Sequence, residues 1–145
     1  MEPKTNMTSS SSEATSQKSG RILIVDDHPY NVEILEELFG IEHHLAIAVS
    51  GEEALTLTPE FCPDLILLDI MMPGIGGFET CRQIRANPDL SHIKIIMVSA
   101  KARESDIELG FQAGADDYVT KPFIFDEIRA KVRYYLSISK NTKVG

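Results

Sequence analysis

The sequence has no long hydrophobic segment. No apolar run approaches the about 18 residues that a membrane-spanning helix needs, and the first residues contain no apolar block like that of a secretory signal. We therefore expect no membrane insertion and a cytoplasmic location. Cysteine is also scarce, with only Cys62 and Cys81. We expect two reduced thiols that serve in packing, because nothing indicates an oxidising compartment.

Basic residues are fewer than acidic ones. The chain has 14 Lys and Arg against 22 Asp and Glu, which gives a formal net charge of -8. This deficit argues against nucleic-acid binding through a broad basic face, and it suits a basic protein partner. Part of the acidity is expected to be functional, because Asp26, Asp27 and Asp69 would crowd one pocket and need a cation.

The 145 residues fit one domain by length. Residues 1–20 hold a Ser-rich polar stretch with few apolar side chains, which predicts a disordered tail because such a segment buries too little surface to offset its ordering entropy. The expected domain covers residues 21–137, and residues 138–145 are expected to form a short C-terminal tail.

From residue 21 onward, apolar runs alternate with segments of helical periodicity. The runs predict strands at 22–25, 45–49, 64–68, 93–98 and 118–119, and the periodic segments predict helices at 29–39, 51–57, 78–84, 104–113 and 125–136. This alternation indicates an α/β protein with a parallel sheet and helices on both faces. Right-handed crossovers leave few topologies, and we expect the flavodoxin-like, doubly wound (βα)5 order 2-1-3-4-5.

Polar residues stand where four of these strands end. They are Asp26 and Asp27, Asp69, Ser99 and Lys121. Ligands of open parallel α/β sheets bind outside the carboxyl ends of the strands. Each residue alone could be a helix cap, a strand-end hydroxyl or a solvated turn lysine. Together, three carboxylates, a hydroxyl and an ammonium predict a site for a divalent cation and a phosphoryl group.

Longer stretches around these residues carry a more specific pattern. They are Ile22-Leu-Ile-Val-Asp-Asp27, Asp64-Leu-Ile-Leu-Leu-Asp-Ile-Met-Met-Pro73 with Gly76-Gly77-Phe78, Val98-Ser-Ala100, and Gly114-Ala-Asp-Asp-Tyr-Val-Thr-Lys-Pro-Phe123. In this combination the chain resembles the receiver domain of two-component response regulators. The resemblance covers about residues 21–137.

The resemblance implies a phosphoacceptor and a metal site. Asp69 would take a phosphoryl group from a phosphohistidine. Asp27 and Asp69 would bind Mg²⁺ directly, Asp26 through water, and the backbone carbonyl of Met71 would add an oxygen; Mn²⁺ would substitute. This agrees with the preference of Mg²⁺ for oxygen ligands and retained waters.

The resemblance also implies a switch. Lys121 would pair with one phosphoryl oxygen, Ser99 would hydrogen-bond another and draw its loop inward, and Tyr118 would swing inward with that loop. The donor would be a sensor histidine kinase or a histidine phosphotransfer protein. The output would be a downstream protein or a covalently linked domain. Such a protein is a signalling switch rather than an enzyme, and it assists only its own phosphotransfer and autodephosphorylation.

Two other classes use related features. A haloacid dehalogenase-type phosphatase also has a strand-end Asp nucleophile, but its general acid two residues later is here Met71, which cannot transfer protons. A flavodoxin needs a phosphate-binding loop after the first strand, where Asp26 and Asp27 would repel the flavin phosphate. The sequence leaves open whether the receiver stands alone or belongs to a larger regulator or hybrid kinase.

Three smaller expectations concern single residues. The four histidines, His28, His43, His44 and His92, are expected at the surface, with His28 able to reach the acidic pocket. The Lys121-Pro122 bond is expected to be cis, as the resemblance implies. At least one carboxyl of the pocket is expected to have a raised pKa, because like charges share a space of low dielectric.

Overall fold

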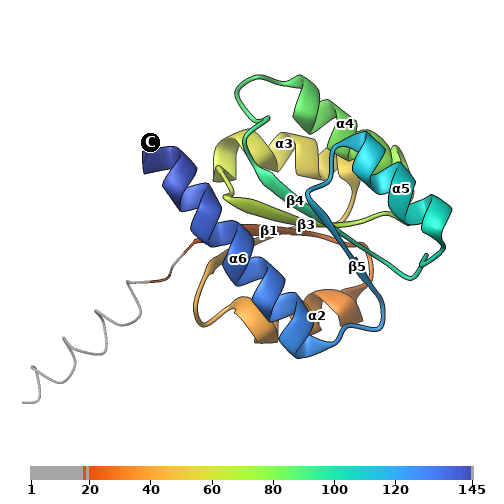
Figure 1. The fold of residues 1–145 in the computed structure, drawn as a ribbon, viewed down its shortest axis with the longest axis horizontal. Coiled ribbons are helices and arrows are strands. Elements are labelled where there is room, and N and C mark those ends of the chain that lie inside the picture. Colours follow the sequence, from red (N-terminus) through yellow and green to blue (C-terminus); the bar gives the residue numbers. More distant parts are fainter. Residues whose placement is uncertain (1–17, 19, 145) are drawn as a thin grey trace, which may run out of the picture.

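The computed structural model describes residues 18 and 20–144, so the tail expected over residues 1–20 lies almost wholly outside the described residues. Strands and helices alternate along the chain (Figure 1). The strands are β1 (Arg21–Val25), β2 (His44–Ala48), β3 (Leu65–Asp69), β4 (Lys94–Ser99) and β5 (Asp117–Thr120). The helices are α2 (Pro29–Phe39), α3 (Gly51–Phe61), α4 (Gly76–Ala86), α5 (Glu104–Ala113) and α6 (Phe125–Val144). None of the described helices has the length and hydrophobicity for a membrane span.

The sheet has five parallel strands in the order β2-β1-β3-β4-β5. The expected α/β doubly wound fold is therefore confirmed. β1 lies between β2 and β3, so the strand order reverses beside it. Val25 pairs with Leu68 across β1 and β3, which brings the next residues of the two strands, Asp26 and Asp69, to the same edge of the sheet.

The sheet has a hydrophobic core on each face, because successive side chains of a strand point to opposite sides. Leu23 and Val25 of β1 belong to one cluster, and Ile22 and Ile24 to the other. The first cluster packs under α3, α4 and α5 and the second under α2 and α6, which cover opposite faces of the sheet in Figure 1. Burial on both faces explains why β3 is almost wholly apolar.

Helix α3 is longer than expected. The sequence predicts an end near residue 57, but α3 continues through Pro59 to Phe61. Pro59 removes one helical hydrogen bond, and it stands only two residues before the helix ends. The last turn is held from outside, since the Arg21 guanidinium lies 4.3 Å from the Phe61 ring centroid and donates to the Phe61 carbonyl at 2.8 Å. These tertiary contacts outweigh the local effect of the proline.

Helix α6 also runs beyond its expected end at residue 136, to Val144. No proline or glycine interrupts residues 137–144, and the buried face continues past Leu136 to Ser139. Residues 138–144, expected as a tail, are therefore helical. The division of the chain into a domain over 21–137 and flanking tails stays a prediction.

Smaller corrections concern single positions. His43 is buried rather than exposed, with its ring 6.1 Å from that of Phe39. Both cysteines are free as expected, but only Cys81 is a packing residue, since Cys62 is exposed at the end of α3. Strands β3 and β4 end one residue later than expected, because Asp69 and Ser99 still pair with the neighbouring strands.

Candidate functional site

The predicted site residues come from four strand ends. Asp26 and Asp27 follow β1, Asp69 and Ser99 are the last residues of β3 and β4, and Lys121 follows β5. The parallel register aligns these ends: Asp69 pairs with Val98, and the backbone of Lys121 donates to the Ser99 carbonyl at 2.8 Å. The expectation that chemistry-bearing residues meet at one edge of the sheet therefore holds in the structure.

Lys121 joins the ends of β1 and β3. Its Nζ lies 3.1 Å from Asp26 Oδ2 and 3.6 Å from Asp69 Oδ1, and all three side chains are largely buried. The Lys121-Pro122 bond is cis, as expected. The ammonium therefore stands beside Asp69 and offsets part of the charge of two carboxylates.

The carboxylate oxygens differ in what they bind. Both oxygens of Asp26 are used, Oδ1 by the His28 backbone N–H at 2.9 Å and Oδ2 by Lys121. Asp69 Oδ1 accepts the Met71 backbone N–H at 3.3 Å, whereas Asp69 Oδ2 is buried without a hydrogen bond. Asp27 Oδ1 is likewise buried without a hydrogen bond, and the His28 ring is its neighbour at 3.1 Å.

Asp69 has a raised pKa. Burial is the main cause, because the side chain is 2% exposed and its charged form loses hydration. The negative charge of Asp26 raises the pKa further, while Lys121 opposes the shift. The expectation that one carboxyl of the pocket titrates above its ordinary range is therefore confirmed, and a cation at this site would lower the cost of the charged form.

Ser99 and Tyr118 meet at the loop that follows β4. The Lys101 backbone N–H donates to Ser99 Oγ at 3.1 Å, and the Tyr118 hydroxyl donates to the Lys101 carbonyl at 2.7 Å. Tyr118 is 8% exposed, and this burial raises the pKa of its phenol. The Tyr118 ring is therefore already buried in this structure. The backbone of Lys101 links its hydroxyl to that of Ser99.

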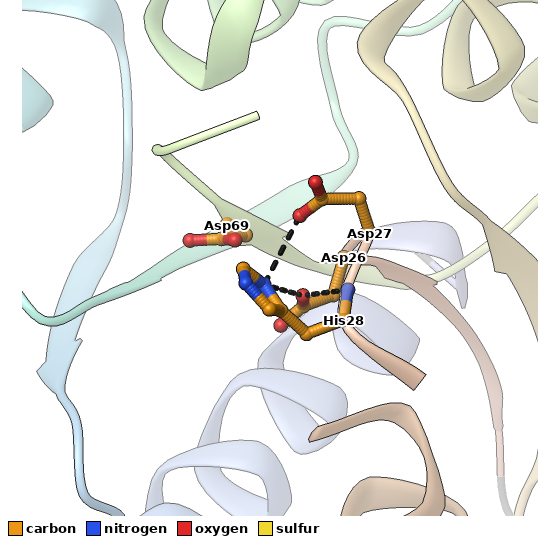
Figure 2. A group of neighbouring side chains, drawn as sticks. All are labelled: Asp26, Asp27, His28 and Asp69. Carbon is orange, nitrogen blue, oxygen red and sulfur yellow. Dashed lines mark hydrogen bonds and ion pairs between the residues drawn. The ribbon is translucent and has the colours of Figure 1, made fainter. Parts of the chain in front are cut away.

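Two features of the site were missed or underestimated from the sequence. Glu52 in the first turn of α3, which the sequence analysis does not single out, accepts the Ile75 backbone N–H at 3.3 Å and so holds the loop after β3. His28, expected at most to reach the pocket, lies among its acids (Figure 2). Its position directly after Asp26 and Asp27 was the available signal.

A divalent cation fits this set of residues. One ligand atom from each of Asp26, Asp27, His28 and Asp69 can be chosen so that all four lie within 4.8 Å of one another. Two buried carboxylate oxygens have no hydrogen bond, and unpaired buried charge is costly unless a partner compensates it. The arrangement thus brings together clustered acids that could hold a cation, a buried carboxylate and an ammonium, and these are group types that phosphoryl transfer uses.

Comparisons with known proteins agree on one family. The family model described as the response regulator receiver domain matches residues 22–133. The DNA-binding response regulator MtrA of Mycolicibacterium smegmatis is 46% identical over 114 residues, which are 78% of this chain and 49% of MtrA. The response regulator PleD of Caulobacter vibrioides is 37% identical over 127 residues, 84% of this chain and 28% of PleD. The chain thus spans half or less of these relatives.

Solved structures lead to the same fold. A response regulator from Chloroflexus aurantiacus superposes with a TM-score of 0.79 at 36% identity, covering 83% of this chain and 99% of that one. The signal receiver domain of a signal transduction histidine kinase from Syntrophus aciditrophicus gives 0.76 at 32% identity, with 81% and 90% covered. Both likenesses extend over most of the described residues.

Proposed function

This chain belongs to the response regulator receiver domain family of two-component signalling, and we propose that Asp69 is its phosphoacceptor. The observation that carries the proposal is the buried carboxylate at the end of β3. Asp69 Oδ2 has no hydrogen bond, while Lys121 Nζ stands 3.6 Å from Oδ1. Asp69 thus combines a free nucleophilic oxygen with a cationic group beside it, which no other acid of the cluster does.

The reaction is transfer of a phosphoryl group from a phosphohistidine. An Asp69 carboxylate oxygen attacks the phosphorus, a P–O bond forms, and the P–N bond to the donor imidazole breaks with its electron pair going to the nitrogen. The product is an acyl phosphate on Asp69. Burial of Asp69 and the fixed Lys121 ammonium position the reactants and stabilise charge, which is where catalysis of phosphoryl transfer chiefly lies.

We assign the metal site to the same edge of the sheet, with Mg²⁺ as the ion and Mn²⁺ as a substitute. Asp27 and Asp69 are the direct ligands, because each has a buried oxygen without a hydrogen bond. Asp26, whose two oxygens are already engaged, takes part through water, and the Met71 carbonyl adds an oxygen. When bound there, the ion would neutralise charge on the transferring phosphoryl group.

The switch that follows rests on Ser99 and Tyr118. Ser99 Oγ hydrogen-bonds an oxygen of the phosphoryl group on Asp69. Because the Lys101 backbone N–H donates to Ser99 Oγ, this bond pulls the loop after β4 inward. The Lys101 carbonyl in turn accepts a hydrogen bond from the Tyr118 hydroxyl. Phosphorylation thereby changes the surface formed by this loop and α5, and with it the binding of a partner.

The chain acts as a signalling switch that assists its own phosphotransfer and autodephosphorylation. Its donor is a sensor histidine kinase or a histidine phosphotransfer protein, and its output is a protein target or a linked output domain rather than nucleic acid bound by this domain. The two free thiols suit the reducing cytoplasm. We expect no membrane insertion, since none of the helices over the described residues could span a membrane.

Magnesium should stabilise the folded chain. At ten times its dissociation constant, Mg²⁺ is expected to add about 1.4 kcal/mol to the free energy of unfolding by mass action, which raises the melting temperature by about 4 °C. Asp27→Asn should reduce this shift, whereas the exposed Asp89→Asn should keep it. Thermal unfolding monitored by circular dichroism at matched ionic strength measures it. A melting temperature that ignores millimolar Mg²⁺ would count against the metal site.

Phosphotransfer profiling tests the proposed function. Each histidine kinase of the source organism is autophosphorylated with labelled ATP and mixed briefly with the chain and Mg²⁺. One kinase, or very few, should pass label to the chain far faster than the rest, and chelation of the metal should stop the transfer. Absence of transfer from every kinase and phosphotransfer protein, together with steady hydrolysis of p-nitrophenyl phosphate, would indicate a phosphatase instead.

A further inference from the structure

His28 places an imidazole among the carboxylates of the site (Figure 2). Its Nδ1 lies 3.1 Å from Asp27 Oδ1 and 3.4 Å from Asp26 Oδ1. Asp69 approaches from the end of β3, on the other side of the ring in this view. An imidazole nitrogen thus lies within 4.8 Å of a carboxylate oxygen from each of the three acids.

The local structure explains why the ring points to the acids. His28 is the N-cap residue of α2, with extended backbone angles, and Pro29 begins the helix behind it. N-cap residues commonly use a side-chain oxygen to accept a helix N–H, but the His28 side chain makes no such capping bond. Its backbone N–H instead donates to Asp26 Oδ1 at 2.9 Å, which holds the residue over the pocket.

The ring is not held by packing. The His28 side chain is 63% exposed, and its ring lies against the carboxylates of Asp26 and Asp27. In the same cluster, Asp69 Oδ2 is buried without a hydrogen bond, and a buried charge is costly unless a partner compensates it. An imidazole nitrogen within 4.8 Å of a carboxylate oxygen from each of three acids is the arrangement of a mixed nitrogen and oxygen ligand set.

We propose that His28 supplies a nitrogen ligand to the metal site, so that the site also takes nitrogen-binding transition-metal ions, such as Co²⁺, alongside Mg²⁺. The inference rests on the proposed metal site and specifies its selectivity. Carboxylates and water suit Mg²⁺, whereas imidazole suits transition metals. His28 therefore sets the ratio of the affinities of the site for Co²⁺ and for Mg²⁺.

The test measures Co²⁺ and Mg²⁺ binding to the parent chain, to His28→Ala and to His44→Ala, at about pH 8 so that imidazole is free to coordinate. His44 is the matched control. It is exposed at the first residue of β2, whereas the site lies beyond the carboxyl ends of the strands. Calorimetry gives the two dissociation constants, and the visible absorption of bound Co²⁺ reports its ligands. Displacement of Co²⁺ by excess Mg²⁺ establishes that both ions share one site.

The expected result is a loss of selectivity in one variant. His28→Ala should lower the preference for Co²⁺ over Mg²⁺ by about tenfold or more and change the Co²⁺ spectrum, whereas His44→Ala should match the parent. A parent that binds both ions while His28→Ala keeps its selectivity and spectrum overturns this inference alone. A parent that binds neither ion overturns the proposed metal site as well. A gain of Mg²⁺ affinity with unchanged Co²⁺ affinity would make His28 an obstruction and would also overturn the inference.

Discussion

Asp69→Asn should abolish phosphorylation of the chain by a small-molecule phosphodonor. With acetyl phosphate and Mg²⁺ the parent should gain the mass of one phosphoryl group, measured on the intact protein. The amide of Asn has no nucleophilic carboxylate oxygen, and the other acids of the cluster do not combine an unpartnered buried oxygen with a nearby Lys121 ammonium. The expected effect is therefore complete loss rather than slowing.

A matched control separates the acceptor from general damage. Asp89→Asn makes the same chemical change at an exposed position outside the cluster and should be phosphorylated like the parent. If Asp69→Asn gains the phosphoryl mass as readily as Asp89→Asn, the acceptor lies elsewhere and the proposed function loses its central residue.

Asp69→Asn should also be more stable than the parent when Mg²⁺ is absent. The folded-state pKa of Asp69 is raised above its ordinary value of 3.8 by burial and by Asp26. Its contribution to stability is thus fully present below the unfolded pKa and is lost as pH rises through the folded pKa. At a pH above the folded-state pKa of Asp69 the parent carries a buried charge that Asn does not, so Asp69→Asn should melt there at the higher temperature.

Gly77→Ala is expected to have the largest effect on stability. A Cβ at Gly77 would lie 2.5 Å from the Asp69 carbonyl oxygen and 2.7 Å from Ile70 Cα. Both are backbone atoms at the end of β3, so neither can move aside as a flexible side chain would. We expect a loss of about 2–3 kcal/mol and a fall of about 10 °C in the melting temperature. Phosphorylation should slow as well, because the displaced backbone carries Asp69.

Gly76→Ala is the control for this prediction. A Cβ there meets nothing closer than the Ile70 carbonyl oxygen at 3.8 Å, although the φ of +76° is unfavourable for alanine. It should cost about 1 kcal/mol from backbone conformation alone. Denaturant unfolding compares the three chains. A Gly77→Ala variant at least as stable as Gly76→Ala would show that the close approach of α4 to β3 is not a tight constraint.

Much of the fold was predictable because β1, β3 and β4 are buried on both faces. Continuous apolar runs such as the one in β3 indicate such strands, and the helical periodicity between them leaves few ways to connect a parallel sheet. The positions that differ are those where a tertiary contact outweighs local preference. Arg21 holds the last turn of α3 beyond Pro59, and the buried face of α6 continues past Leu136 to Ser139.

The site was predictable to the level of residue type and sheet edge. Asp26, Asp69 and Lys121 meet because parallel strands end together, which follows from the alternation of elements. Which oxygen stays unpartnered depends on side-chain geometry that no spacing encodes. The inward position of Tyr118 likewise depends on a hydrogen bond to the Lys101 carbonyl, a backbone group that the sequence pattern does not single out.

Chemical mapping of the acyl phosphate can identify the phosphoacceptor residue itself. The parent chain is phosphorylated with acetyl phosphate and Mg²⁺ and then treated with borohydride, which reduces an aspartyl phosphate to homoserine. Digestion and tandem mass spectrometry locate the modified residue. We expect homoserine at position 69 in place of Asp69, formed only when Mg²⁺ was present during phosphorylation. Homoserine at Asp26 or Asp27 instead, or a stable phosphoryl group on a serine or histidine, would contradict it.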